Sequence, residues 1–260
     1  MQEVDFSIHS GEMVGLIGPN GAGKTTVFNL IVGFFRPTWG KIVFRDEEIT
    51  GLFPHEVARK GIARTFQDTR VFEEETLWQN LRTGCHGWLN SGWIQVLLKT
   101  SSFAKGEKAS QQKAAEILDF MGLLPLKEER AKNIPQYARK KLAIALALAT
   151  EPQVLLLDEP FSGLNPQEAE EIMSLIHKIW ERRVTIFLIE HNMKVVKNLC
   201  ERIIVLNFGR KIAEGSFHDI SREPHVIEAY LGGEGVFLSG QDRYFFWGIP
   251  HSSRDFPGDG

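Results

Sequence analysis

The sequence predicts an α/β fold with a mainly parallel sheet, and three short apolar runs are the main reason. MVGLI at 13–17, VLLL at 154–157 and VTIFLI at 184–189 lack the alternation of a half-exposed strand, so they are typical of strands covered on both faces. Between the second and third runs, apolar residues recur from Pro166 at the spacing of an amphipathic helix. They are Ile172, Leu175, Ile176 and Ile179. A strand, a helix and a further strand in this order indicate a parallel sheet with crossover helices.

Two smaller parts are predicted beside this core. The segment PTWGKIVFRDEEI at 37–49 combines turn residues with alternation, which predicts a small antiparallel β subdomain. Residues 71–150 contain no strand pattern, and several of their apolar residues share one helical face. These residues are Ala114, Ile117, Leu118 and Met121. We therefore expect one domain over 1–232, with a core of 1–70 and 151–232 and a helical insertion of 71–150.

Two segments leave alternatives open. Trp88 and Trp93 lie in a stretch that contains Gly and Ser, and they could be core aromatics or part of an exposed docking surface. After residue 232 the composition shifts to Gly, Pro and Ser, with a YFFW cluster at 244–247 and no periodicity. We expect 233–260 to be a disordered tail or a non-native extension, with a partner-binding peptide as the alternative.

Composition narrows the classes of function. Of the 260 residues, 43% are hydrophobic and 24% are charged, which is ordinary for a soluble globular protein. A net charge of -3 gives no electrostatic reason to expect a nucleic-acid partner. Cys85 and Cys200 do not suggest a zinc site or a disulfide framework. The apolar runs are shorter than the roughly 20 residues of a membrane-spanning helix, so we expect any membrane association to pass through a partner.

The strongest chemical signal is GPNGAGKTT at 18–26, directly after the first predicted strand. It matches the pattern G-x-x-x-x-G-K-[ST], which predicts a P-loop NTPase core. Glycines let the loop turn its amides toward the β-phosphate, and the following helix adds its positive N-terminal end. We expect Lys24 to contact the β- and γ-phosphates of ATP and the Thr25 hydroxyl to ligate Mg²⁺. The predicted nucleotide-binding residues are Gly18, Asn20, Gly21, Ala22, Gly23, Lys24, Thr25 and Thr26.

A second chemical signal follows the apolar run at 154–157. VLLLDEP places Asp158 and Glu159 at the C-terminal end of a buried strand, where open parallel sheets bind their ligands. We expect Asp158 to hold Mg²⁺ through water, and Glu159 to align and polarise the attacking water. An acidic pair alone could equally cap a loop, but together with the phosphate loop it favours hydrolysis of ATP.

Three further segments complete an ordered set. They are Gln67 in ARTFQDTRVF, the loop SGLNPQE at 162–168, and His191 in IEHNM. In this order the motifs resemble those of the ATP-binding subunit of an ATP-binding cassette (ABC) transporter, over about residues 3–232. The sequences IARTFQ, GLNPQE, LIEHNMKVV, GRKIAEG and IEAYLG are most similar to the ATPases of branched-chain amino acid importers.

The resemblance implies an ATPase that energises transport through membrane-spanning permease subunits, bound peripherally at the cytoplasmic face of the plasma membrane. A solute-binding protein is implied as an indirect partner. Gln67 would contact both Mg²⁺ and the attacking water, and His191 would hold the γ-phosphate. Together with Glu159, these are the catalytic residues that the resemblance implies.

One departure from the family concerns its Leu-Ser-x-Gly-Gln signature, which clasps the γ-phosphate bound to the opposite subunit. Aligning RKKLAIALAL with the helix after the signature places IPQYA, 134–138, at the signature position. Pro135 lacks the serine hydroxyl, and Tyr137 cannot replace a glycine that lets the backbone approach phosphate. We expect a proline-started helix with a packed tyrosine here, and weak presentation of backbone amides to phosphate is the alternative.

This departure predicts a heterodimer. The chain keeps its own half of an ATP site, but that half needs the intact signature of a second, different ATPase subunit, and the site completed by IPQYA is expected to be slow or silent. The alternative is a regulatory nucleotide-binding subunit with little hydrolysis of its own. A cassette protein acting on ribosomes or DNA is disfavoured, because the chain has one phosphate loop, no sustained heptads and no basic patch.

Two smaller departures concern adenine and the dimer interface. The aromatic residue that stacks on adenine in the family lies on a segment before the one aligned with MQEVDFSIHSGE, so either that segment is missing here or adenine is held with less help. We expect Phe6 to be a core strand residue rather than a replacement. Asn165 stands where many ABC ATPases have aspartate in the loop that crosses the dimer interface, and asparagine occurs there in this subgroup.

Overall fold

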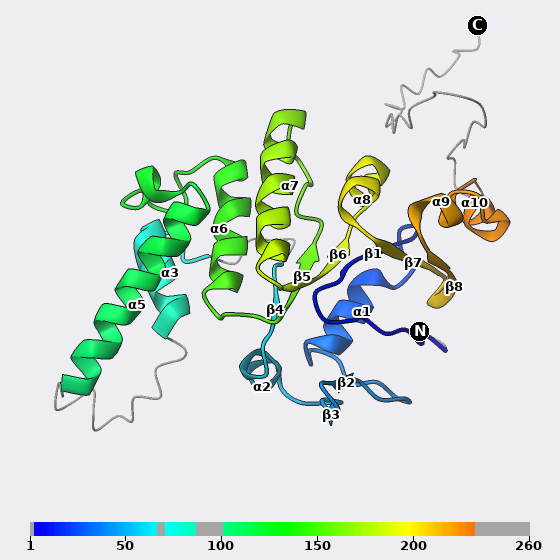
Figure 1. Cartoon of the computed structure of the whole chain (residues 1–260), viewed down its shortest axis with the longest axis horizontal. Coiled ribbons are helices and arrows are strands. Elements are labelled where there is room, and N and C mark those ends of the chain that lie inside the picture. The colour runs from blue at the N-terminus through cyan, green and yellow to red at the C-terminus, as the bar shows by residue number, and fades with distance from the viewer. Residues whose placement is uncertain (1–2, 67–70, 87–100, 232–260) are drawn as a thin grey trace, which may run out of the picture.

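The computed structural model describes residues 3–66, 71–86 and 101–231 of the chain. Its centre is a six-stranded sheet in the order β4-β5-β6-β1-β7-β8, parallel throughout except for the pair β7 and β8 (Figure 1). The strands are β1 Met13–Ile17, β2 Val43–Phe44, β3 Glu47–Glu48, β4 Ile62–Arg64, β5 Val154–Asp158, β6 Thr185–Ile189, β7 Arg202–Asn207 and β8 Arg210–Gly215. The helices are α1 Lys24–Ile31, α2 Pro54–Arg59, α3 Leu77–His86, α5 Ser101–Phe120, α6 Gln136–Leu148, α7 Pro166–Glu181, α8 Met193–Leu199, α9 Phe217–Ile220 and α10 Pro224–Leu231, with a 3₁₀ turn at Leu124–Leu126.

The predicted α/β class is confirmed, and β1, β5 and β6 begin and end within one residue of the predicted runs. Their side chains alternate between two apolar clusters on opposite faces of the sheet. In β5, for example, Leu155 and Leu157 join one cluster and Leu156 joins the other. Because each fully buried leucine contributes roughly 1.5–3 kcal/mol, a polar residue at every second position would weaken one cluster, and the runs are therefore continuous.

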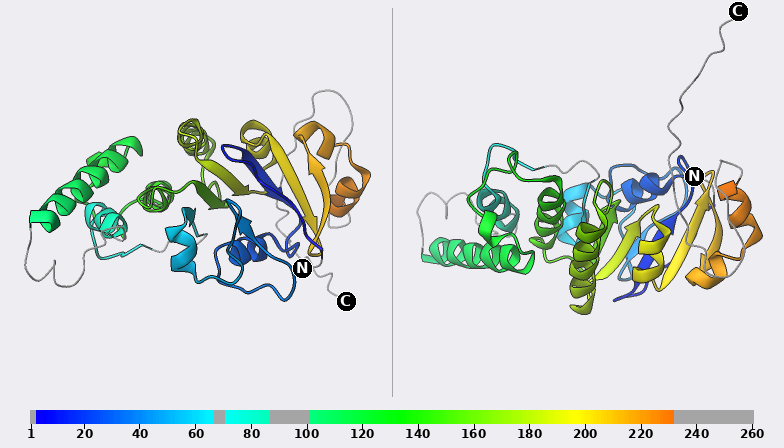
Figure 2. Two further views of the ribbon diagram at one scale, coloured as in Figure 1. Left: turned by 60° about the horizontal axis from the view of Figure 1, so that its bottom comes forward. Right: turned by 90° about the horizontal axis from the view of Figure 1, so that it is seen from above.

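Helices cover both faces of the sheet. α7 and α8 lie on one side, and α1 lies on the other with the β2–β3 hairpin (Figure 2). On the α1 side, the rings of Phe28 and Phe187 pack with centroids 5.2 Å apart. The sheet order places β1 beside β6 and β7, which come much later in the chain. Open α/β sheets bind ligands beyond the carboxyl ends of their strands where the strand order reverses in this way.

The helix predicted after Pro166 is α7, and its first turn explains where it begins. The Asn165 side chain accepts a hydrogen bond from Glu168 N at 2.9 Å, and the Glu168 carboxylate accepts one from Asn165 N at 3.0 Å. Pro166 occupies the first turn, where its missing N–H costs nothing. The predicted core positions of this helix are all buried, namely Ile172, Leu175, Ile176 and Ile179. Asn165 therefore has a local role as a helix cap.

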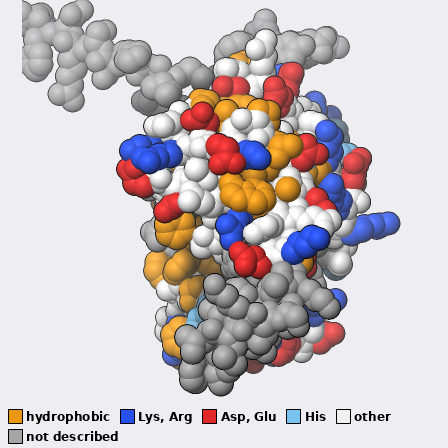
Figure 3. Space-filling view, turned by 90° about the vertical axis from the view of Figure 1, so that its left-hand side faces the viewer, with side chains coloured by type: hydrophobic (Ala, Val, Ile, Leu, Met, Phe, Trp, Pro, Cys, Tyr) orange, Lys and Arg blue, Asp and Glu red, His pale blue; other side chains and the backbone are white. Residues whose placement is uncertain are grey.

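The regular secondary structure in the described part of 71–150 is helical, as predicted, and turns, loops and an isolated bridge between Thr76 and Arg130 connect the helices. On α5 and just after it, Ala114, Leu118 and Met121 are fully buried, while Ile117 is partly buried against the same cluster. Figure 3 shows the end of the molecule that these helices form, where apolar side chains gather among charged side chains of both signs. Within the described ranges, no helix combines the length and apolarity needed to cross a bilayer. The division into core and insertion stays a prediction.

The antiparallel hairpin is confirmed, but it is shorter than predicted, with two residues in each strand. Its turn residues Arg45 and Asp46 have φ of 54° and 62°, and positive φ at both central residues gives the twist that a two-residue hairpin needs.

Three strands of the described structure were not predicted from the sequence, namely β4, β7 and β8. β4 has three residues, too few for a pattern, and β7 and β8 form a second antiparallel hairpin at the sheet edge. Trp88, Trp93 and residues 233–260 lie outside the described residues, so their predicted alternatives stay open.

Candidate functional site

The predicted phosphate loop connects β1 to α1, and backbone geometry requires its glycines. A Cβ on Gly18 would lie 2.2 Å from the carbonyl oxygen of Leu206 in β7, far inside van der Waals contact. Gly21 and Gly23 have φ of 80° and 103°, in the region that glycine adopts without steric cost. The loop is thus anchored against β7 at one end and turns into α1 at the other.

The remaining loop residues divide between an anchored side and an open side. Ala22 is buried, and its carbonyl oxygen accepts a hydrogen bond from Gly209 N at 2.9 Å. Asn20 and Thr25 are exposed, and Thr26 is half-buried. The exposed side is therefore the one available to a nucleotide.

Lys24 begins α1 and is folded into the loop. Its side chain is buried, and Nζ donates to the carbonyl oxygens of Gly18 at 2.7 Å and Pro19 at 3.0 Å. Burial lowers the pKa of Lys24, while the nearby carboxylates of Glu159 and Asp158 act to raise it. The phosphate-loop lysine and the predicted acidic pair thus interact electrostatically at the carboxyl ends of the strands.

Asp158 ends β5 and is held by a buried ion pair. Arg64 Nη2 lies 2.7 Å from Asp158 Oδ2, and the two side chains are 5% and 4% exposed. Arg64 Nη1 also donates to Asn29 Oδ1 at 2.6 Å, and the guanidinium lies 5.4 Å from the ring centroid of Phe28. One arginine therefore joins β4 to the end of β5 and to the helix after the phosphate loop.

Replacing Arg64 by methionine is expected to destabilise the fold by roughly 3–5 kcal/mol, because Asp158 is left buried without its partner. The double variant Arg64→Met with Asp158→Asn should regain much of this loss, since no uncompensated charge remains. Urea unfolding of the wild type, both single variants and the double variant measures the coupling energy. Strictly additive losses would show that the two side chains are not coupled.

Glu159 and His191 come together although they lie on different loops. Glu159 follows β5 and His191 follows β6, and these strands are neighbours in the sheet. His191 Nε2 lies 2.6 Å from Glu159 Oε1, and the side chains are 37% and 20% exposed. Glu159 has φ of 47°, an uncommon conformation for a residue with a Cβ and one that clusters at functional sites. The pair is held in a defined geometry and is still accessible to a substrate.

Two of the three residues predicted to hold Mg²⁺, Thr25 and Asp158, lie at the carboxyl ends of β1 and β5, and the third, Gln67, lies outside the described residues. Thr25 is exposed in the first turn of α1, and Arg64 engages one of the two carboxylate oxygens of Asp158. In the described part of the chain, no cluster of three or more His, Cys, Asp or Glu residues forms a metal site by itself. These donors fit Mg²⁺, because an ion carried by nucleotide phosphates takes one or two protein carboxylates besides water.

The segment at the signature position forms the start of a helix. Pro135 is the N-cap of α6, which begins at Gln136. The Tyr137 hydroxyl donates to the Glu171 carboxylate of α7 and accepts from Lys141 Nζ at 3.0 Å. Lys141 Nζ also lies 4.7 Å from the Tyr137 ring centroid. This arrangement matches the predicted proline-started helix with a packed tyrosine.

The model of the ABC transporter family matches residues 1–162, which is more than half of the chain. The chain belongs to the ABC transporter family. A model named branched-chain amino acid ATP-binding cassette transporter matches residues 210–236. Membership of this ATPase family implies that the chain binds ATP and acts with membrane permease subunits.

Individual relatives of this ABC ATPase match along most of its length. It is 42% identical over 233 residues to the high-affinity branched-chain amino acid transport ATP-binding protein LivG of Escherichia coli K12, which covers 89% of this chain and 91% of the relative. It is 42% identical over 230 residues to BraF of Pseudomonas aeruginosa, with the same description, covering 88% and 90%. The crystal structure of the ADP conformation of MJ1267, an ATP-binding cassette of an ABC transporter, has a TM-score of 0.75 and 31% identity, covering 87% of this chain and 90% of that chain.

In this ABC ATPase, the structure brings four of the predicted site residues together at the carboxyl ends of the strands, namely Lys24, Asp158, Glu159 and His191. Gln67 lies outside the described residues. Phe6 packs on the core as predicted, with its ring centroid 5.6 Å from that of Phe187, but the predicted strand is wrong because its segment pairs with no strand.

Sequence reasoning missed two buried charged residues of this ABC ATPase, Arg64 and Glu190. Both lie within sequences that carry the family resemblance, IARTFQ and LIEHNMKVV. For Glu190 a signal was present, because it directly follows an apolar run just as Asp158 does. For Arg64 the signal was absent, since a basic residue near a short strand is usually exposed.

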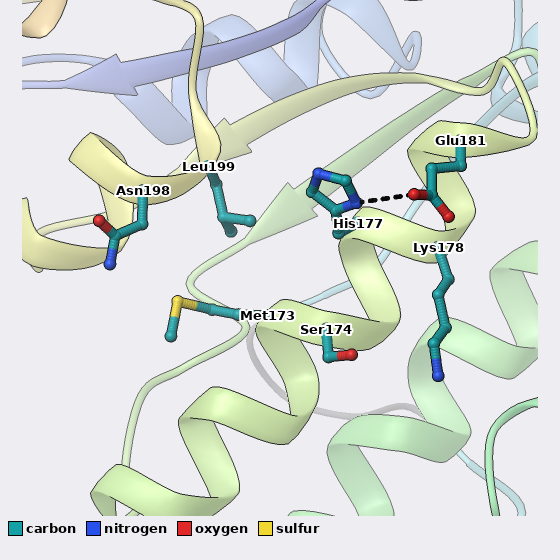
Figure 4. A pocket seen from close by; sticks show the side chains of 7 residues that line it. All are labelled: Met173, Ser174, His177, Lys178, Glu181, Asn198 and Leu199. Carbon is teal, nitrogen blue, oxygen red and sulfur yellow. Dashed lines mark ion pairs between the residues drawn. The ribbon is translucent and has the colours of Figure 1, made fainter.

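A separate groove of about 430 Å³ lies between α7 and α8 (Figure 4). Its lining residues are Met173, Ser174, His177, Lys178, Glu181, Asn198 and Leu199. They belong to the C-terminal half of α7 and the end of α8, toward the amino ends of the strands. The groove therefore lies toward the end of the strands opposite to Lys24 and Asp158, and it is not the ATP site.

Proposed function

We propose that this chain is the ATP-hydrolysing subunit of a branched-chain amino acid importer, bound peripherally at the cytoplasmic face of the plasma membrane. The observation that carries hydrolysis is the contact between His191 Nε2 and Glu159 Oε1, close to Lys24. The substrate class rests on the relatives, since LivG and BraF are both described as branched-chain amino acid transport ATP-binding proteins. Permease subunits and a solute-binding protein complete the importer.

Each residue of the site has a distinct task in this proposal. Lys24 and the loop amides bind the β- and γ-phosphates of ATP. Glu159 orients and polarises the attacking water, and His191 bridges Glu159 and the γ-phosphate. Gln67 contacts the same water and links the site to the permease. Mg²⁺, which neutralises charge on the phosphates when bound, would be held by Thr25, Gln67 and Asp158.

The signature segment supports a heterodimer with a second, different ATPase subunit. Tyr137 occupies the glycine position, and its hydroxyl is bonded to Glu171 of the same chain. Gln136 packs against the loop before α7, since a Cβ on Gly163 would lie 2.7 Å from Gln136 Nε2. A segment bound in this way to its own chain is poorly placed to clasp a nucleotide on another subunit.

The predicted helical insertion, 71–150, offers a docking surface for the permease. Next to α3, a hollow of about 350 Å³ is lined by Phe72, Glu75, Gln79, Arg82 and Thr83. Phe72 is 60% exposed, although large aromatic side chains are normally buried. Docking of a membrane-domain helix at this hollow would connect ATP-driven movement to the permease.

The test is ATP hydrolysis by the purified chain alone and by the complex with its co-expressed permease and second ATPase subunits. We expect the complex to be faster on the order of 10²-fold, because loss of preorganised donors to a transferring group typically costs that much. Rapid hydrolysis by the chain alone as a homodimer would contradict the heterodimer. A complex without hydrolysis would instead favour the regulatory subunit that the sequence left as the alternative.

A further inference from the structure

A buried carboxylate beside the proposed catalytic pair has no part in the proposed chemistry. Glu190, between β6 and His191, is 4% exposed. Its Oε2 accepts hydrogen bonds from His191 N at 2.9 Å and Asn192 N at 3.2 Å. Its Oε1 accepts one from Phe161 N at 3.3 Å. Both oxygens are thus used to hold backbone.

These bonds join two loops that carry different functional groups. His191 and Asn192 form the turn after β6, whereas Phe161 lies two residues after Glu159 in the loop after β5. Asn192 also caps α8, because its side chain accepts from Lys194 N at 3.0 Å. One side chain therefore fixes the loop of His191, the start of α8 and the loop of Glu159 relative to each other.

We propose that Glu190 is a positioning residue for ATP hydrolysis, which ties these two loops so that His191 Nε2 and Glu159 Oε1 stay in contact. The inference rests on the proposed roles of Glu159 and His191. A residue with φ of 47°, as Glu159 has, keeps that conformation only where its surroundings over-determine it. The bond from Phe161 N to Glu190 is one such restraint, and the bond from Glu159 N to Ile189 O at 3.0 Å is another.

The cost of this arrangement favours a functional reason for it. A carboxylate removed from water is destabilising unless hydrogen bonds compensate. Burial raises the pKa of Glu190, and the backbone bonds from Asn192, His191 and Phe161 lower it part of the way back. An apolar side chain at the end of β6 would extend the buried run without this cost, but it could not accept hydrogen bonds from two loops.

The sharpest test is Glu190→Gln, which keeps the shape of the side chain. An amide has one acceptor oxygen, so if it accepts from His191 N and Asn192 N, its NH₂ group faces the Phe161 N–H. The turn after β6 then stays formed, and the tie to the Glu159 loop breaks. In the complex, we expect kcat to fall about tenfold, because small misplacements of a catalytic group are costly, while KM for ATP changes less than about twofold.

A second readout does not depend on activity. Hydrogen exchange of the purified chain should become faster in peptides covering 159–163 and remain unchanged in peptides covering 193–199. Glu12→Gln is the matched control, because it weakens the bond between Glu12 Oε1 and Arg202 Nε at 2.7 Å, which lies at the amino ends of the strands, away from the proposed site. This control is expected to leave both kcat and exchange at 159–163 unchanged.

Parallel measurement of Glu159→Gln separates failure of this inference from failure of the proposed function. If the wild-type complex hydrolyses ATP and Glu159→Gln does not, the proposed function stands, and an unchanged kcat for Glu190→Gln overturns the role of Glu190. If the complex shows no hydrolysis that depends on Glu159, the proposed function fails. In that case, unchanged hydrogen exchange at 159–163 in Glu190→Gln contradicts the proposal that Glu190 connects the two loops. If Glu190→Gln does not fold, Glu190→Asp, whose carboxylate is one CH₂ shorter, takes its place with the same expected and contrary outcomes.

Discussion

Glu159→Gln in the assembled transporter is expected to lower ATP hydrolysis by about 10²–10⁴-fold while ATP still binds. The reason is chemical, since an amide cannot polarise a water as a carboxylate does, and a positioned base contributes about this factor. The shape of the side chain is kept, and the amide oxygen can still accept a hydrogen bond from His191 Nε2. Lys24 and the loop amides, which hold the phosphates in our proposal, are untouched.

Phosphate release and binding of a fluorescent ATP analogue, measured on the same complex, check both halves of this expectation. Glu170→Gln is a matched control, because it makes the same chemical change on the exposed surface of α7, and its hydrolysis should equal that of the wild type. If Glu159→Gln hydrolyses ATP as fast as Glu170→Gln, then Glu159 is not catalytic. The chain would then be a nucleotide-binding regulatory subunit.

The sequence was most informative where one local pattern decided the structure. β1, β5 and β6 are continuous apolar runs because both faces of the sheet are covered, and α7 follows from its apolar spacing together with the cap at Asn165. β4 could not be found, since its three residues are a strand through their pairing with β5. The β7–β8 hairpin was not predicted, because an antiparallel pair departs from the order of parallel strands and crossover helices that the rest of the sheet follows.

The candidate site shows the same division. The phosphate loop and Asp158 could be predicted, because glycine spacing and an acidic strand end are visible in one segment. The partnership of Glu159 with His191 depends on β5 and β6 being neighbours, so it required the fold. The role of Arg64 depends on a buried ion pair between two strands, which one sequence does not reveal. Glu190 follows an apolar run as Asp158 does, but the contact with the loop of Glu159 is known only from the fold.

Pro135→Ser combined with Tyr137→Gly is expected to raise ATP hydrolysis by the chain alone on the order of 10²-fold. In our proposal the chain already holds its own half of the site, and the missing part is a serine hydroxyl and an approachable backbone at the signature. Donors of this kind are worth about that factor at a transferring group. Ala138 is kept, because it is 2% exposed and the glutamine of the family signature would overpack the helix there.

The rate should rise with the square of protein concentration at low concentration, because each site then needs two copies of the chain. Tyr137→Phe separates a restored signature from a loosened one, since it removes the hydroxyl bonds to Glu171 and Lys141 but keeps the ring. We expect the Tyr137→Phe variant to hydrolyse ATP no faster than the wild-type chain alone.

Loss of the tyrosine and introduction of a glycine in the first turn of α6 should destabilise the fold by about 1 kcal/mol or more, so thermal unfolding is measured beside activity. If the double variant is folded and inactive alone while the wild-type complex is active, IPQYA is not the reason that a second ATPase subunit is needed.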